Sequence, residues 1–297
     1  MFLEEVLDYD MCLTPVKIPI YDSLGTLQSV SSVPCGKCRE CLAERRRHWT
    51  HRLYYENFFS LSSFFLTLTY DDQHVPLDGV SKRDCQLFLK RFRKFMPKLR
   101  YFLVSEYGDT FGRPHYHALV FFPKASVSLV DCVRAVEKSW QQGFIKVGDV
   151  TIQSIQYCSK YCLKDKVDFE GFVDPESGEW IERQRTFALM SRRPGIGSQL
   201  LSWPEWVKNH TFGEGNFKDV VFDKTVSLPR YFRDKIFTDI QKNNHNARIA
   251  EKYRKNRVQT SGRTIRGNEF LQAVNQVPGR SSKIYLRPIQ GSERGDS

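Results

Sequence analysis

GRPHYHALVFF, from Gly112 to Phe122, joins a polar turn to an apolar run and places two histidines at the junction. The run is rich in aromatic and branched side chains, which predicts a β-strand. Because alternate strand residues point to one face of a sheet, His115 and His117 project together, on the side of Leu119 and Phe121. The intervening residues face the other way and can pack against helices. This stretch therefore predicts a two-histidine surface at the mouth of a hairpin.

The elements on both sides of this strand indicate the fold. Aromatic and branched runs predict strands at 64–70, 100–106, 115–122 and 144–152. Apolar residues at helical spacing predict helices at 81–96, 126–140 and 155–165. The order β-α-β-β-α-β is that of the α+β, ferredoxin-like split βαβ fold, an antiparallel sheet with both helices on one face. The last helix must then pack elsewhere, against the opposite face.

Extensions flank this core. We expect a Cys-rich, basic segment at 1–60, the core at 61–168, an insertion with accessory strands at 169–228, and a basic helical region with a tail at 229–297. The 297 residues carry a net charge of +11. From residue 241 onward, 12 Lys and Arg stand against 4 Asp and Glu. That excess favours either a nucleic-acid phosphate backbone as partner or a solubilising tail.

Other classes of protein are disfavoured. No apolar stretch is long enough to span a bilayer, and the first residues lack the basic and apolar regions of a secretory signal. We therefore expect no membrane association, a cytosolic location and reduced cysteines.

A carboxylate is expected beside the histidine pair. Glu106 ends the preceding strand, nine residues before His115, so antiparallel pairing would place it next to the pair. Two histidines and one carboxylate with open positions suit a divalent ion such as Mg²⁺ or Mn²⁺, which accepts a phosphate oxygen. The alternative is that the two histidines begin the strand without any metal.

The last predicted helix carries a second candidate group. Tyr157 and Tyr161 lie four residues apart and share a face, and Lys160 and Lys164 share an adjoining one. Tyrosine can attack phosphorus, and a nearby ammonium favours its phenolate. Paired aromatics also pack in cores, which is the alternative. Together with a metal face, this helix predicts cleavage of a phosphodiester in which tyrosine keeps the 5′-phosphate and frees a 3′-OH.

Three stretches in this order resemble the motifs of HUH endonucleases: FFLTLTY (64–70), GRPHYHALVFF (112–122) and YCSKYCLKD (157–165). PCGKCRECLAERRRHW (34–49) and RRPGIG (192–197) extend the resemblance to the replication initiation proteins of gokushovirus-type microviruses, phages with circular single-stranded DNA. The resemblance implies rolling-circle replication, in which the initiator nicks one strand, stays on the 5′ end and later rejoins it.

Carried over to this sequence, the resemblance implies a role for each candidate. His115 and His117 would be metal ligands with Glu106 as the third. Tyr157 and Tyr161 would be nucleophiles, in either order. Lys164, and less directly Lys160, would support the phosphate or orient the metal site. FFLTLTY has no assigned function, and sheet core is its alternative.

The resemblance also implies partners. The substrate would be single-stranded DNA or supercoiled origin DNA in the host bacterial cytoplasm. No G-x4-G-K-[ST] motif occurs in the sequence, so a host helicase and polymerase would be needed. Two other functions remain open: an HUH relaxase or transposase acting on another DNA, and a non-catalytic ferredoxin-like module that binds single-stranded DNA. An RNA-directed function rests only on charge and aromatics.

The N-terminal cysteines form a separate candidate site. Cys35, Cys38 and Cys41 make a C-x2-C-x2-C pattern, and Cys12 lies upstream. Four thiolates could bind a structural Zn²⁺ and tie the N-terminal arm to the following helix. An iron–sulfur cluster or four reduced, unliganded cysteines are the alternatives. We expect Cys158 and Cys162, beside the tyrosines, to serve packing.

Overall fold

The structure is a computed structural model of the whole chain, and it describes residues 12, 14–108, 112–161, 171–173 and 177–259. The chain divides into two compact units, Met1–His245 and Asn246–Ser297. Among the helices in the described ranges, none is long and apolar enough to cross a membrane.

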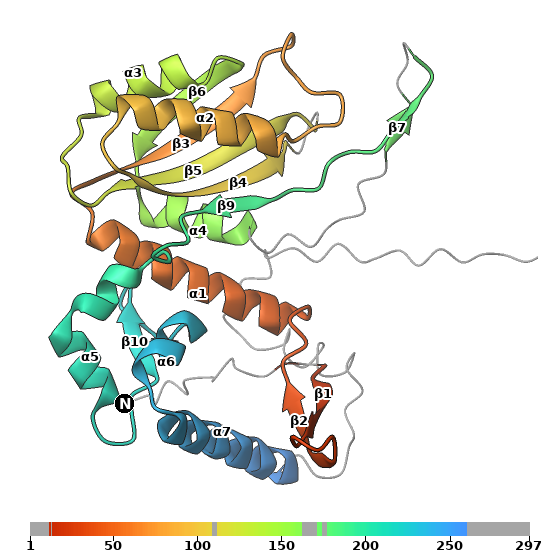
Figure 1. Cartoon of the computed structure of the whole chain (residues 1–297), viewed down its shortest axis with the longest axis vertical. Helices are drawn as coiled ribbons and strands as arrows, with labels where there is room; N and C mark the ends of the chain where they lie inside the picture. Colours follow the sequence, from red (N-terminus) through yellow and green to blue (C-terminus); the bar gives the residue numbers. More distant parts are fainter. Residues whose placement is uncertain (1–11, 13, 109–111, 162–170, 174–176, 260–297) are drawn as a thin grey trace, which may run out of the picture. The chain divides into compact units, whose positions relative to one another are not determined.

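A five-stranded antiparallel sheet lies at the centre of the first unit (Figure 1). Its strands, in spatial order, are β6 (Gly143–Asp149), β3 (Ser62–Tyr70), β5 (Pro114–Phe122), β4 (Arg100–Tyr107) and β9 (Ala188–Met190). The first four have the order of a split βαβ fold, which confirms the ferredoxin-like prediction. The edge strand β9, which pairs with β4, is an addition to that pattern.

Two helices cover one face of the sheet, as predicted: α2 (Lys82–Phe95) and α3 (Leu129–Ser139). A serine caps each of them, because the hydroxyls of Ser81 and Ser128 accept a backbone N–H three residues on. The core on this face includes Phe88, Phe92, Val136, Tyr116, Ala118 and Val120. The side chains of β5 that alternate with the histidines therefore pack against these helices.

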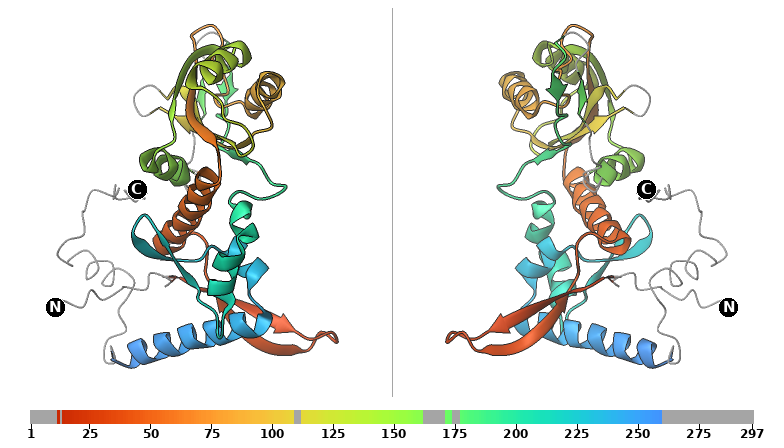
Figure 2. Two further views of the ribbon diagram at one scale, coloured as in Figure 1. Left: turned by 90° about the vertical axis from the view of Figure 1, so that its left-hand side faces the viewer. Right: turned by 90° about the vertical axis from the view of Figure 1, so that its right-hand side faces the viewer.

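The opposite face is covered by α1 (Arg39–Phe58) and α4 (Ile152–Tyr161). Figure 2 shows α2 and α4 on opposite sides of the sheet. The core here consists of Leu53, Phe102, Val104, Leu119, Phe121, Ile155, Cys158 and Ile196. The expected position of the last helix is thus confirmed, and so is the packing role of Cys158, whereas Cys162 lies outside the described residues.

The boundary between β6 and α4 differs from the prediction. We expect a strand to 152, but β6 ends at Asp149 and α4 begins at Ile152. Thr151 and Ser154 form a reciprocal cap: Thr151 Oγ1 accepts from the N–H of Ser154 at 3.2 Å, and Ser154 Oγ accepts from the N–H of Thr151 at 2.9 Å. This pair of hydrogen bonds starts the helix earlier than its apolar spacing indicates.

A third apolar cluster joins α1 to the elements after the sheet. These elements are η1 (Ser198–Ser202), α5 (Pro204–Thr211), β10 (Lys218–Val221), β11 (Lys224–Ser227) and α6 (Arg230–Ile236). Asp219 lies within the cluster, and its Oδ2 accepts from Tyr55 Oη at 3.0 Å and Trp206 Nε1 at 3.2 Å, and lies 3.0 Å from His51 Nε2. The buried carboxylate thereby ties β10 to α1 and α5.

The remaining elements are two hairpins and one helix. They are β1 (Val16–Tyr21) with β2 (Leu27–Val33), β7 (Phe172–Val173) with β8 (Trp180–Ile181), and α7 (Asp239–Gln259).

Candidate active site

Strand pairing brings the predicted site residues together. In the β4–β5 register Glu106 lies opposite His115, and in the β3–β5 register Thr67 and Thr69 lie opposite His117 and His115. All of these side chains share the face that α4 covers, because alternate positions of a strand point the same way.

Tyr157 reaches this face from α4. Its hydroxyl donates to Glu106 Oε2 at 2.8 Å and lies 3.4 Å from His117 Nε2. His117 Nε2 is in turn 3.2 Å from Glu106 Oε2. Glu106 and His117 are buried, whereas the tyrosine is 37% exposed. A hydroxyl, an imidazole and a carboxylate therefore converge where solvent, or a ligand, reaches the tyrosine.

Two threonines of β3 orient the histidines. Thr67 Oγ1 is 3.2 Å from His117 Nδ1, and Thr69 Oγ1 is 3.0 Å from His115 Nδ1. A hydroxyl that accepts the Nδ1 proton leaves Nε2 as the nitrogen with a lone pair, which is the tautomer a metal ligand needs. Sequence reasoning missed this role. The alternation of T-L-T was a signal, but its use requires the register of β3 with β5.

An aromatic wall flanks the same group. The ring of Phe65 stacks on His117, with centroids 5.7 Å apart and planes at 13°. Its edge contact with Tyr157 has centroids 6.4 Å apart at 76°. The ring thus restricts the rotation of both side chains.

The environment of His115 keeps its imidazole neutral. Burial lowers its pKa below 6.5, and His117 and Arg113 lower the pKa further, against the opposing effect of Glu106. Gly108 leaves open space beside the ring, because a Cβ there would lie 2.9 Å from His115 Nε2. A neutral imidazole with free space at Nε2 is suited to bind a cation.

The three predicted ligands are spread more widely than the sulfurs of a thiolate site. Among the described residues, one group of potential ligands has all its atoms within 4.8 Å of one another, and it is the cysteine group. Alternate positions of a strand are about 6.6 Å apart, which explains the spread between His115 and His117.

The other candidates on the tyrosine helix are only partly described. Lys160 is half-buried near the end of α4. Tyr161 is the last residue of that helix, and its side chain, like all of Lys164, lies outside the described residues.

The four N-terminal cysteines gather into one cluster. Cys12 Sγ lies 3.8 Å from Cys38 Sγ, and Cys35 Sγ lies 4.0 Å from Cys41 Sγ. A Zn–S bond of about 2.3 Å in a tetrahedron implies sulfurs about 3.8 Å apart. The cluster could therefore hold a metal ion, and the tight sequence spacing that suggests strain does not prevent the approach.

Hydrogen bonds prepare the cluster for an ion. Thr14 and the backbone N–H groups of Lys37 and Cys38 lower the pKa of Cys35 to about 5, whereas burial raises that of Cys41 to about 12. Thiolates this close repel one another, so one ionises while another keeps its proton. A divalent cation removes that conflict.

Comparison with known proteins places this site in a family. Residues 63–166, which hold the sheet, the histidines and the tyrosines, match the family of replication-associated proteins of the ORF2 type. The replication-associated protein VP4 of Bdellovibrio phage phiMH2K is 29% identical over 251 residues, which cover 75% of this chain and 76% of that protein. The chain belongs to the phage replication-associated proteins. The resemblance to microvirus-type replication initiators is thereby confirmed.

Two further relatives match over shorter stretches. The replication-associated protein ORF4 of Chlamydia phage 1 is 28% identical over 221 residues, 68% of this chain and 53% of that protein. The replication-associated protein ORF2 of Spiroplasma virus 4 is 28% identical over 155 residues, 45% of this chain and 48% of that protein. The chain thus spans about half the length of these two relatives. No solved structure matches it significantly.

Proposed function

We propose that this protein initiates phage rolling-circle replication by metal-dependent nicking and joining of single-stranded DNA through a 5′-phosphotyrosine. One observation carries the proposal: the Tyr157 hydroxyl lies 2.8 Å from Glu106 and 3.4 Å from His117, at a partly exposed position. A nucleophile held beside a carboxylate and an imidazole is the arrangement that phosphoryl transfer to tyrosine requires.

The donor set fits a hard divalent ion. His115, His117 and Glu106 supply two neutral nitrogens and one carboxylate, the threonines fix the nitrogen tautomers, and Gly108 leaves space at His115. These residues would hold Mg²⁺ or Mn²⁺. When bound, such an ion supplies positive charge to a phosphate oxygen during displacement.

The protein's own residues account for the transfer. The Tyr157 oxygen forms a bond to phosphorus, and the bond from phosphorus to the O3′ of the preceding nucleotide breaks. The hydroxyl proton points at Glu106, which is the first acceptor on offer. The departing oxygen takes up a proton and becomes a 3′-OH. Joining is the reverse, in which a 3′-OH attacks the phosphotyrosine and releases the tyrosine.

Neighbours on α4 would complete the cycle. Tyr161, one helical turn from Tyr157, is placed by its spacing to make the second cut while the first tyrosine holds the 5′ end. Lys160 and Lys164 would stabilise the phosphate charge. Supercoiled origin DNA, a host helicase and polymerase, and the host bacterial cytoplasm belong to the same proposal, which is supported by the names of the relatives.

A gel assay tests the reaction class. Labelled single-stranded circles are incubated with the protein in Mn²⁺ or in EDTA, and covalent adducts are separated under denaturing conditions. We expect a metal-dependent adduct that Glu106→Gln reduces and Tyr21→Phe, an exposed tyrosine in β1, leaves unchanged. If the circle stays intact under all metal and protein concentrations while DNA binding persists, the protein is instead a non-catalytic binding module.

We further propose that the cysteine cluster holds a structural Zn²⁺. The sulfur separations fit one tetrahedral ion, whereas the thiolates of an iron–sulfur cluster bind different irons and stand further apart. The ion would join Cys12, before β1, to Cys41 in the first turn of α1. Native mass spectrometry should find one zinc per chain, lost in Cys35→Ser and retained in Cys132→Ala. Metal-free wild type, purified with zinc present, would contradict this assignment.

A further inference from the structure

Two adjoining hollows lie away from the candidate active site. The larger is a cleft of about 880 Å³ beside the edge of the sheet formed by β4 and β9. Its charged lining consists mainly of exposed side chains, which are Lys82, Arg93, Lys98, Lys124, Arg192 and Arg193. None of its lining residues, all within the described ranges, is acidic. Such a surface is complementary to a chain of phosphates.

A buried ion pair builds the wall of this cleft. Arg100 pairs with Glu56 of α1 and donates to the carbonyls of Pro194 at 3.1 Å and Gly195 at 2.9 Å. Glu56 also accepts from the N–H of Gly197 at 2.6 Å. The RRPGIG turn is therefore fixed to the sheet and to α1. That anchoring holds Arg192 and Arg193, which begin the turn, at the rim of the cleft.

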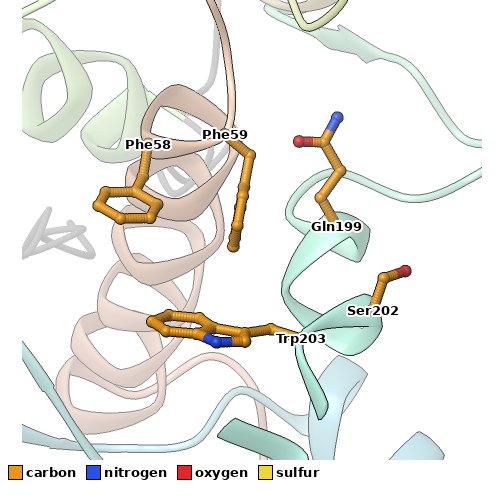
Figure 3. A pocket seen from close by; sticks show the side chains of 5 residues that line it. All are labelled: Phe58, Phe59, Gln199, Ser202 and Trp203. Carbon is orange, nitrogen blue, oxygen red and sulfur yellow. The ribbon is translucent and has the colours of Figure 1, made fainter. Parts of the chain in front are cut away.

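The smaller hollow, about 420 Å³, is an aromatic slot (Figure 3). Phe58 and Trp203 form two nearly parallel walls, with planes at 11° and centroids 6.4 Å apart. Phe59 stands at 86° to Trp203 and closes one side. Phe58 is 57% exposed and Trp203 is 39% exposed. Large aromatic faces left open to solvent are costly unless something covers them.

The dimensions of the slot match one nucleobase. Stacked bases repeat about every 3.4 Å, so a flat ring between two others needs about 6.8 Å from wall to wall. The 6.4 Å between Phe58 and Trp203 is close to that value and too large for direct stacking. Gln199 and Ser202 line the same slot and offer an amide and a hydroxyl to a base edge. An aliphatic or aromatic protein side chain would leave these groups unused.

Gln199 also lines the basic cleft, so the two hollows are continuous. We propose that they form one binding track for single-stranded DNA, in which the basic cleft holds the phosphates and one unstacked base inserts between Phe58 and Trp203. This inference rests on the proposed function for the identity of the nucleic acid. Arg100 at the cleft and Glu106 at the active site are six residues apart on β4, or about 20 Å. The track would therefore hold the strand at a distance from the cut and keep it from diffusing away.

The test measures binding without cleavage. The full chain carrying Tyr157→Phe is titrated in EDTA with single-stranded oligonucleotides in which 2-aminopurine replaces one base at a time. We expect stacking to quench the probe at one position. Phe58→Ala and Trp203→Ala should abolish that quench and weaken binding about 5- to 150-fold. Phe212→Ala, which removes a more exposed aromatic ring, should change neither.

Salt dependence tests the cleft. For single strands each lost phosphate contact lowers the slope of log K against log salt by about 0.7. Arg192→Ser with Arg193→Ser should therefore lower the slope by about 1.4, whereas Arg134→Ser with Lys138→Ser, exposed positions on α3, should leave it unchanged. Thermal unfolding checks that every variant is folded.

The outcomes separate the two proposals. Unchanged quenching in folded Phe58→Ala and Trp203→Ala, or equal salt slopes in both charge variants, overturns the track, as does tight binding confined to duplex DNA. If wild type then still forms the covalent adduct, the proposed function stands. Absence of the adduct, with quenching and slope as expected, overturns the proposed function and leaves the track.

Discussion

Thr67→Val is the change that most specifically probes how the histidines are oriented. Valine has nearly the shape of threonine and favours strands, so β3 should keep its pairing with β5 and β6. The substitution removes one hydroxyl, 3.2 Å from His117 Nδ1, and nothing else at the site. The imidazole then loses the group that fixes its tautomer.

The magnitude follows from burial. His117 is 8% exposed, so little water can replace the lost hydroxyl, and an unsatisfied buried donor costs about 1–3 kcal/mol. Loss of such a supporting hydrogen bond lowers metal affinity about 10- to 100-fold. His115 is more exposed, so water can replace the hydroxyl of Thr69, and Thr69→Val should have the smaller effect.

Isothermal titration with Mn²⁺ measures the affinity directly, alongside the yield of covalent adduct at limiting Mn²⁺. Thr225→Val, the same change at an exposed position of β11, serves as the control. Wild-type Mn²⁺ affinity in a folded Thr67→Val protein would refute the assignment of His117 as a ligand oriented through Nδ1.

Three further predictions concern stability. Burial opposes ionisation of Glu44, but His48 and Arg47 outweigh it and lower its pKa from 4.5 to about 2. The stabilisation, about 3 kcal/mol, is full above pH 4.5 and is lost as pH falls through about 2, so wild type and Glu44→Gln should converge in urea unfolding over that range. Asp219→Ala strips three hydrogen-bonding partners and should cost about 3–5 kcal/mol in denaturant unfolding at neutral pH. Gly143→Ala, where φ is 142° and a Cβ would lie 2.2 Å from the Asp71 nitrogen, should lower the melting temperature, whereas Gly148→Ala, with open space, should not.

The order and type of the central elements could be predicted because their signals are local. The apolar spacing of α2, with Phe88 and Phe92 on one face, and the alternation in β5 need no knowledge of distant contacts. The three residues of β9 are held in place by pairing with β4, almost 90 positions earlier, so nothing in their own sequence distinguishes them from a loop. The end of β6 depended on a hydrogen-bonded cap, which overrides the strand propensity of Val150 and Ile152.

The candidate site divides in the same way. Spacing alone could predict that His115, His117 and Glu106 share a location, since a hairpin fixes its own register. The approach of Tyr157 to Glu106 required the helix to pack at one angle on the sheet. The threonine contacts and the stacking of Phe65 on His117 required pairing across 50 residues. Phe58 and Trp203 lie so far apart in the chain that only tertiary packing reveals their parallel walls.

The central claim is that Tyr157 is the residue that attacks the DNA. Wild-type protein is incubated with a single-stranded circle and Mn²⁺, the adduct is digested with nuclease and protease, and the nucleotide-bearing peptide is sequenced by mass spectrometry. The geometry at Glu106 and His117 predicts a nucleotide phosphate on Tyr157, and no adduct from Tyr157→Phe at the first cut. A phosphate found on a residue outside α4, or an undiminished adduct from Tyr157→Phe, would contradict the account.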